Sequence, residues 1–133
     1  MADEITISLN VDVAAGNYRA SFRPGTIQPD MATIIGSDIA QNITTTIMNL
    51  NAGSIAGTNA GGIYWFRNLS TSTSTTFDPS IKISSCAATA AGTSFPFLNL
   101  RPGEYALGRC VTTQFSAISS TATANLQFGI MSL

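Results

Sequence analysis

The chain has 133 residues, a net charge of −1 and no histidine. The absence of histidine excludes Ser-His-Asp and Cys-His nucleophile systems and histidine-ligated zinc sites. The five arginines are scattered, so there is no basic stripe for nucleic-acid phosphates, and no apolar run approaches the roughly 20 residues of a membrane-spanning helix. We therefore expect neither a nucleic acid nor a membrane as a partner.

The composition is poor in charge and rich in hydroxyl groups. Charged residues make up 10% of the chain, against roughly 25% in an average soluble domain, and the sequence contains 15 Ser and 17 Thr. Lysine and glutamate normally keep sheet edges from pairing with other chains, yet Lys82 is the only lysine. The composition indicates an assembly component, and we expect a homo-oligomer, with a trimer preferred over a dimer.

The N-terminal segment predicts two strands. Apolar and polar residues alternate over residues 5–13, and a period of two places one face of a strand on a core. Residues 15–17 (Ala-Gly-Asn) supply a turn, and the alternation resumes over residues 18–23. The apolar face of residues 5–13 fits the domain's own core better than an arm laid on a neighbour. Removal of residues 1–13 is therefore expected to unfold the protein.

In residues 31–50 a helix competes with a strand. Isoleucine recurs at every fourth position from Ile35 to Ile47, which suits a helix. However, Gly36 interrupts the pattern, and residues 44–47 are all β-branched, which favours a pleated sheet. We favour a strand over residues 41–50 and allow a short turn of helix near residues 37–41.

The later segments predict short strands separated by loops. Residues 63–69 are the most hydrophobic stretch and predict a central strand, in which the adjacent Trp65 and Phe66 point to opposite faces. At most one of the two therefore lies in the core. Residues 51–62 and the Ser/Thr run 70–76 are expected to be loops. Further strands are expected near residues 77–85, 94–100, 104–111 and 123–131.

A tight turn is predicted at residues 101–104 (Arg-Pro-Gly-Glu). Proline presets φ at the first central position, and glycine accepts the positive φ that a type II turn requires at the second. About eight short strands without a convincing helix predict an all-β fold, an antiparallel β-sandwich of jelly-roll type. The length predicts that residues 1–133 form a single domain.

The sequence offers no convincing catalytic, cofactor-binding or metal-binding residues. Asp78 and Glu104 could act as a carboxylate pair, but each adjoins a proline-containing segment and is more simply a turn residue. Cys86 and Cys110 are expected to be buried free thiols, because a protein made in the cytoplasm rarely forms disulfides. We therefore expect a non-enzymatic protein without a cofactor or a metal ion.

Several blocks of the chain resemble small proteins encoded by tailed bacteriophages. They comprise residues 21–25 (Ser-Phe-Arg-Pro-Gly) with 28–31, residues 62–69 ending in Arg-Asn-Leu, residues 95–109 with the Pro-Gly-Glu turn, and the closing segment 122–133. The order and spacing of these blocks cover most of the chain. The resemblance implies a virion-associated β-fold and transfers no catalytic residue.

The resemblance and the composition together predict a capsid decoration (cement) protein that binds the major capsid protein and stabilises the head shell. The expected location is the capsid exterior, after synthesis in the host cytoplasm, because residues 1–4 lack the features of a secretory signal. One alternative is a receptor- or glycan-binding module of a tail fibre or tip, with Tyr64, Trp65 or Tyr105 as a sugar-stacking face. Another is a structural component of the tail or collar.

Overall fold

The structure is a computed structural model that describes residues 6–23, 25–27, 33–51, 62–71, 78–85, 96–110 and 114–132. These residues form strands, turns and irregular segments, and none of them is helical. Accordingly, they contain no helix of the length and apolarity needed to cross a membrane. The chain divides into two compact units, residues 1–32 and residues 33–133. The single-domain interpretation of residues 1–133 stays a prediction.

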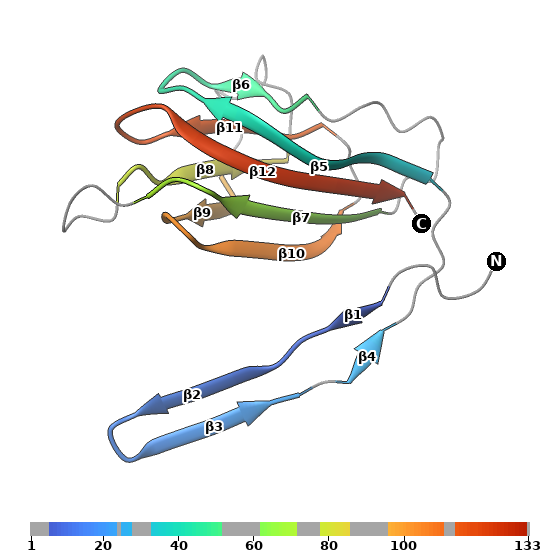
Figure 1. The fold of residues 1–133 in the computed structure, drawn as a ribbon, viewed down its shortest axis with the longest axis vertical. Helices are drawn as coiled ribbons and strands as arrows, with labels where there is room; N and C mark the ends of the chain where they lie inside the picture. Colours follow the sequence, from blue (N-terminus) through green and yellow to red (C-terminus); the bar gives the residue numbers. More distant parts are fainter. Residues whose placement is uncertain are drawn as a thin grey trace. The chain divides into compact units, whose positions relative to one another are not determined.

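The first unit is a pair of antiparallel ribbons (Figure 1). In the shorter ribbon β1 (Ile7–Ser8) pairs with β4 (Thr26–Ile27), and in the longer one β2 (Val11–Ala15) pairs with β3 (Tyr18–Phe22). The predicted turn joins β2 to β3, and Gly16 takes a φ of 57° there. A positive φ at this position is required by the primed turns that close two-residue hairpins.

The second unit consists of two antiparallel four-stranded sheets, drawn as two layers in Figure 1. One sheet has the order β10-β7-β12-β5, and the other has the order β6-β11-β8-β9. The strands are β5 (Thr33–Ile43), β6 (Met48–Asn49), β7 (Gly62–Asn68), β8 (Ile81–Ser84), β9 (Leu98–Leu100), β10 (Tyr105–Cys110), β11 (Ser116–Ser119) and β12 (Ala124–Ser132). The all-β, antiparallel part of the fold prediction is confirmed.

The two sheets share one hydrophobic core. Alternation along β12 directs Leu126, Phe128 and Ile130 inward, and β8 contributes Ile81 and Ile83 from the other sheet. The rings of Phe66 and Phe115 pack edge to face with their centroids 5.3 Å apart, an arrangement that aromatic pairs favour. Because side chains from both sheets fill the same core, the unit is sandwich-like.

Residues 33–50 contain strands and no helix, as favoured from the sequence, but the strand boundaries differ. The strand β5 covers residues 33–43, so the short helical turn allowed near residues 37–41 is wrong. The single strand expected over residues 41–50 is also wrong, because the chain leaves the sheet after Ile43 and pairs again only at β6. The β-branched run at residues 44–47 lies between two strands rather than within one.

The structure contains one strand that the sequence does not predict, β11. Its sequence, Ser-Ala-Ile-Ser, has serines at positions where a strand pattern needs apolar residues, yet three of its four side chains are buried.

The sequence predicts that the N-terminal strand lies in the core. Its residues instead belong to the separate first unit, where Leu9, Val11 and Val13 are exposed.

Candidate interaction surfaces

The hairpin of β2 and β3 has one apolar face. Val11 lies opposite Phe22, Val13 opposite Ala20, and Ala15 opposite Tyr18. Directly opposed residues share a face, and alternate residues along a strand do so too, so these side chains form one surface, which we call the hairpin apolar face. Tyr18 is 62% exposed and Phe22 is 59% exposed. The face is therefore open to solvent.

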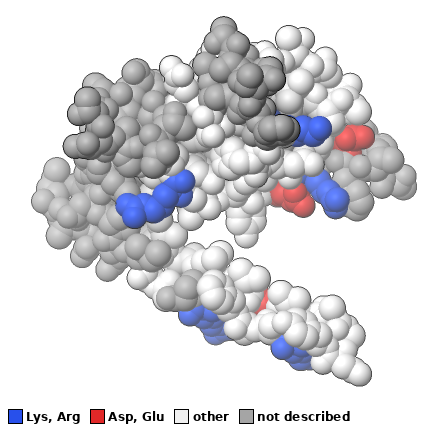
Figure 2. Space-filling view, turned by 180° about the vertical axis from the view of Figure 1, so that it is seen from behind, with Lys and Arg blue, Asp and Glu red and all other residues white. Residues whose placement is uncertain are grey.

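The opposite face of the hairpin is polar. It carries Asp12, Ser21 and Arg19, together with Ala14. Beyond the end of β3, the Arg23 guanidinium lies 3.8 Å from the Asp12 carboxylate, and both side chains are exposed, so the pair contributes little to stability. The charges of the protein are scattered, and most of the described surface in Figure 2 is uncharged. The hairpin is thus a two-faced ribbon whose apolar face is uncovered.

The outer face of the sheet β10-β7-β12-β5 carries Trp65. Phe66 is buried in the core, so the adjacent Trp65 points to the other side of β7. Its indole lies across Gly129 of β12, where a Cβ atom would collide with the five-membered ring. Trp65 is half-buried. The prediction that only one of Trp65 and Phe66 lies in the core is confirmed.

Tyr64 makes the corresponding contact on the inner face. It lies opposite Gly108 of β10, and a Cβ atom there would come within 2.6 Å of the phenol oxygen. Its ring packs against Phe66 and Phe115, with centroid distances of 5.0 and 5.7 Å. Tyr64 therefore does not share a face with Trp65. Of the aromatic residues considered for sugar stacking, only Trp65 and Tyr105 point outward from this sheet.

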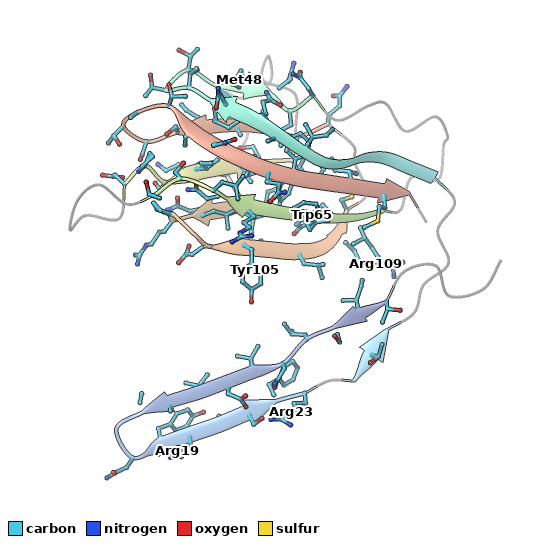
Figure 3. All side chains as sticks on the ribbon, in the orientation of Figure 1. Arg19, Arg23, Met48, Trp65, Tyr105 and Arg109 are labelled. Carbon is cyan, nitrogen blue, oxygen red and sulfur yellow. The ribbon has the colours of Figure 1, made fainter. Side chains whose placement is uncertain are left out.

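β10 presents a row of exposed side chains beside Trp65. Leu107 lies opposite Trp65 and is 53% exposed, and Tyr105 lies opposite Arg67 and is 74% exposed. Arg109 continues the row and is exposed as well. Figure 3 labels Tyr105 and Arg109 on β10 and Trp65 on the neighbouring β7. Because β10 is the last strand of its sheet, this apolar row ends at a sheet edge.

Two blocks that carry the resemblance meet at a buried asparagine. The Nδ2 group of Asn68 donates hydrogen bonds to the carbonyls of Pro79 (3.0 Å) and Leu100 (3.1 Å), and its Oδ1 accepts one from the Ser70 N–H (3.0 Å). Asn68 is fully buried, so these bonds satisfy a polar group that would otherwise be costly to bury. The Arg-Asn-Leu block therefore joins the end of β7 to the other sheet.

The predicted turn at residues 101–104 adjoins this asparagine. The Glu104 N–H donates to the Arg101 carbonyl (3.0 Å), and Gly103 takes a φ of 82°, as a type II turn requires. The Gly103 N–H donates to the Asn68 carbonyl (2.9 Å), and the Asn68 N–H donates to the Glu104 carbonyl (2.9 Å). The turn prediction is confirmed, and backbone geometry accounts for the block.

Asp78 and Glu104 each accept a hydrogen bond within the fold. The Ser120 hydroxyl donates to Asp78 Oδ1 (2.8 Å), and Ser120 also exchanges hydrogen bonds with Ser80. Glu104 Oε2 accepts the Arg101 N–H (2.8 Å) within its own turn. The interpretation of Glu104 as a turn residue agrees with its bond, whereas Asp78 accepts its bond from the segment between β11 and β12. No group of three or more His, Cys, Asp and Glu side chains forms a metal-binding cluster within the described ranges.

Cys110 at the end of β10 is a free thiol, as predicted, but it is half-buried rather than buried. Cys86 lies outside the described residues. Burial raises the pKa of the Cys110 thiol above its usual value, and a hydrogen bond with the Gly62 backbone opposes this effect. Burial also raises the pKa of Tyr64, with a smaller contribution from Cys110. Both groups are therefore held in their neutral forms at neutral pH.

The chain matches no protein-family model, and the comparisons with curated proteins and with solved structures give no significant match.

Proposed function

We propose that the protein is a non-enzymatic structural protein of a bacteriophage virion, a capsid decoration (cement) protein. In this proposal it binds the major capsid protein on the outside of the head and stabilises the shell. The observation that carries the proposal is the hairpin apolar face, which remains open to solvent. The low charge of the chain and the resemblance of its sequence blocks to phage proteins support the same conclusion.

An isolated two-stranded hairpin is at best marginally stable in water, because it has no second layer to cover its apolar side. Tyr18 and Phe22 are both more than half exposed, and an aromatic side chain can bury about 150–250 Å² when a partner covers it. A shell presents the same binding patch many times. One contact surface on the protein can therefore serve for many copies on the particle.

The proposal includes a jelly-roll arrangement of the two sheets. Counted from β5 to β12, one sheet holds the sixth, third, eighth and first strands, and the other holds the second, seventh, fourth and fifth. This order is the one that two interlocked Greek keys produce, and folds of that kind are common in viral capsid proteins and in lectins. The strand order thus supports the fold and the two main functional candidates alike.

Quantitative mass spectrometry of purified virions tests the location. A decoration protein is expected in hundreds of copies per particle, since it follows the icosahedral symmetry of the shell. A handful of copies would contradict decoration and favour the tail or collar. Absence from the particle would contradict the whole proposal.

Binding of purified protein to shells that lack it tests the attachment surface. Phe22→Ser and Tyr18→Ser are expected to weaken binding at least tenfold while leaving the thermal transition unchanged, because both side chains are exposed. Arg19→Ser is the matched control, since it changes the polar face of the same hairpin. Equal binding by all variants would show that the hairpin apolar face is not the attachment surface.

A receptor- or glycan-binding module remains the second candidate, favoured by the position of Trp65 and Tyr105 on the outer side of one sheet. Flat aromatic faces on a sheet can stack on sugar rings. The fluorescence of Trp65, the single tryptophan, discriminates between the candidates. A blue-shifted emission that acrylamide does not quench would exclude a sugar-binding surface at Trp65, whereas a shift on addition of an oligosaccharide would favour it.

A further inference from the structure

In the described part of residues 33–133, the two sheets end in four edge strands, β5, β10, β6 and β9. A free edge invites pairing with another chain, and proteins limit this with short strands, bulges, proline or charged side chains, lysine above all. β6 has two residues and β9 has three, which leaves little backbone to pair. β5 is longer, but its register against β12 shifts around Ile130. Three of the four edges are thus short or irregular.

β10 carries only one such feature, the charged side chain of Arg109 near its end. It has six residues, Tyr-Ala-Leu-Gly-Arg-Cys, with no proline and no lysine. It pairs with β7 in one continuous register without a bulge. Its outward row also includes two exposed apolar side chains, Tyr105 and Leu107. Of the four edges, β10 is therefore the one suited to pairing with another strand.

The backbone of β10 determines which residues are available at this edge. The Asn68 N–H donates to the Glu104 carbonyl, so the backbone of Glu104 is directed toward β7. The direction alternates along a strand in an antiparallel ladder. Tyr105, Leu107 and Arg109 therefore direct their N–H and C=O groups away from β7. These residues also form the exposed outer row, so the available backbone and the exposed side chains coincide.

We propose that β10 pairs antiparallel with β10 of a second copy of this chain, so that two four-stranded sheets join into one eight-stranded sheet across a twofold axis. In an isologous contact the same patch serves both partners. The axis passes through Leu107, which pairs with the partner's Leu107, while Tyr105 pairs with the partner's Arg109. Each of these pairs exchanges backbone hydrogen bonds, because the N–H and C=O groups of all the paired residues point toward the free edge.

The side chains fit this register on the outer face. Arg109 comes beside the ring of the partner's Tyr105, where a guanidinium and an aromatic face attract each other. Leu107 already lies next to Trp65, so the two leucines extend one apolar stripe from the tryptophan of one copy to that of the other. A register shifted by one residue would place outer side chains against inner ones.

The contact involves one strand from each copy, so it is smaller than the roughly 1,200 Å² of stable complexes. We therefore expect a reversible dimer that forms as the protein is concentrated. The twofold contact favours a dimer where the composition favoured a trimer. The inference rests on the edge of β10 alone, so it does not depend on the proposed function, and virion composition does not test it.

Cysteine crosslinking of the full-length protein tests the pairing. Hydrogen-bonded pairs in antiparallel sheets have a Cα separation of about 5.5 Å, which lies within the range of a disulfide. Leu107→Cys is expected to form a covalent dimer on oxidation, with the 107–107 link identified by peptide mapping. Asn99→Cys is the matched control, because Asn99 is exposed on the short edge strand β9. Equal crosslinking of the two variants would overturn the proposal.

Light scattering over a range of concentrations gives the second readout. The wild-type mass is expected to rise from that of the 13.9 kDa chain toward twice that value. Leu107→Lys is expected to remain monomeric with an unchanged thermal transition, because Leu107 is exposed and lysine blocks edge pairing. A wild-type trimer, or a Leu107→Lys variant that dimerises like the wild type, would overturn the proposal.

The register has its own test. A mixture of Tyr105→Cys and Arg109→Cys proteins is expected to form mixed covalent dimers, whereas Tyr105→Cys alone is not. If Tyr105→Cys crosslinks with itself in preference to Arg109→Cys, the twofold axis does not pass through Leu107 and the proposed register is wrong.

Discussion

The hairpin of β2 and β3 and the β7–β12 pair are both antiparallel and differ in what covers their apolar side chains. Along the hairpin and along β12, apolar residues alternate with other residues. Phe66 and Phe128 are fully buried because a second sheet faces them, whereas Phe22 and Tyr18 are more than half exposed. A period of two therefore shows that a strand has an apolar face, and it does not show what that face packs against.

The largest difference between these regions is expected for a pair of phenylalanine substitutions. Phe66→Ala removes a fully buried ring and should lower the free energy of unfolding by about 3–5 kcal/mol. Phe22→Ala in the hairpin should change it by less than about 0.5 kcal/mol, the usual range for surface positions. Urea denaturation of both variants measures the contrast. Similar losses would mean that the hairpin apolar face is covered in solution.

Asn68 tests how far the two sheets depend on one polar junction. Asn68→Ala leaves the carbonyls of Pro79 and Leu100 without their donor, and a buried unsatisfied group costs about 1–3 kcal/mol. We expect a loss of about 3 kcal/mol in unfolding free energy. The exposed Asn99→Ala is the control and should be nearly neutral. A mild effect at Asn68 would show that water replaces the amide.

The glycine contacts on the two faces of β7 should respond differently to an added methyl group. Gly129→Ala forces the Trp65 indole off β12 and should cost about 1–3 kcal/mol, as overpacking does. The tryptophan emission should move to longer wavelength as the ring is displaced. Gly108→Ala crowds Tyr64 instead, so a similar loss of stability is expected without that shift. An unchanged Gly129→Ala spectrum would contradict the packing of Trp65.

The raised pKa of Cys110 predicts that the free energy of unfolding decreases slightly at alkaline pH. Its pKa is raised in the folded state by burial, so the neutral thiol is favoured by folding. That stabilisation is fully present below about pH 8.5, the ordinary cysteine pKa, and is lost as the pH rises through the folded-state value. Thermal midpoints of wild type and Cys110→Ala should converge at high pH. A constant difference would contradict the assignment.

The smallest effect is expected from removing residues 1–27. The core side chains come from residues 43–130, so the thermal transition of the two sheets should survive the truncation. This expectation replaces the one drawn from the sequence, in which loss of residues 1–13 unfolds the protein. Differential scanning calorimetry measures the outcome, and loss of the transition would restore the earlier interpretation.

Much of the second unit could be predicted from the sequence, because its signals are local. The opposite orientations of Trp65 and Phe66 follow from adjacency alone, and the turn at residues 101–104 follows from proline and glycine. The strand β11 could not be predicted, since its buried serines lack an apolar pattern.

The candidate surfaces were less predictable than the strands. Exposure of the hairpin apolar face depends on contacts that no local pattern encodes. The free edge of β10 depends on strand order, which is set by pairings between residues far apart in the chain. The single lysine and low charge favour the hypothesis of an assembly component, but they do not indicate which edge or face is uncovered.

The contacts of Tyr64 with Gly108 and of Trp65 with Gly129 lie on opposite faces of the sheet. Together they help to determine the register of β7 against β10 and β12. A slip of β7 by two residues would preserve which side chains face inward. It would, however, place Tyr64 opposite Ala106 or Cys110, and Trp65 opposite Gln127 or Met131. Each of these residues has a Cβ atom where the aromatic ring needs space. The contacts of β7 with both neighbouring strands therefore favour the observed alignment over one shifted by two residues.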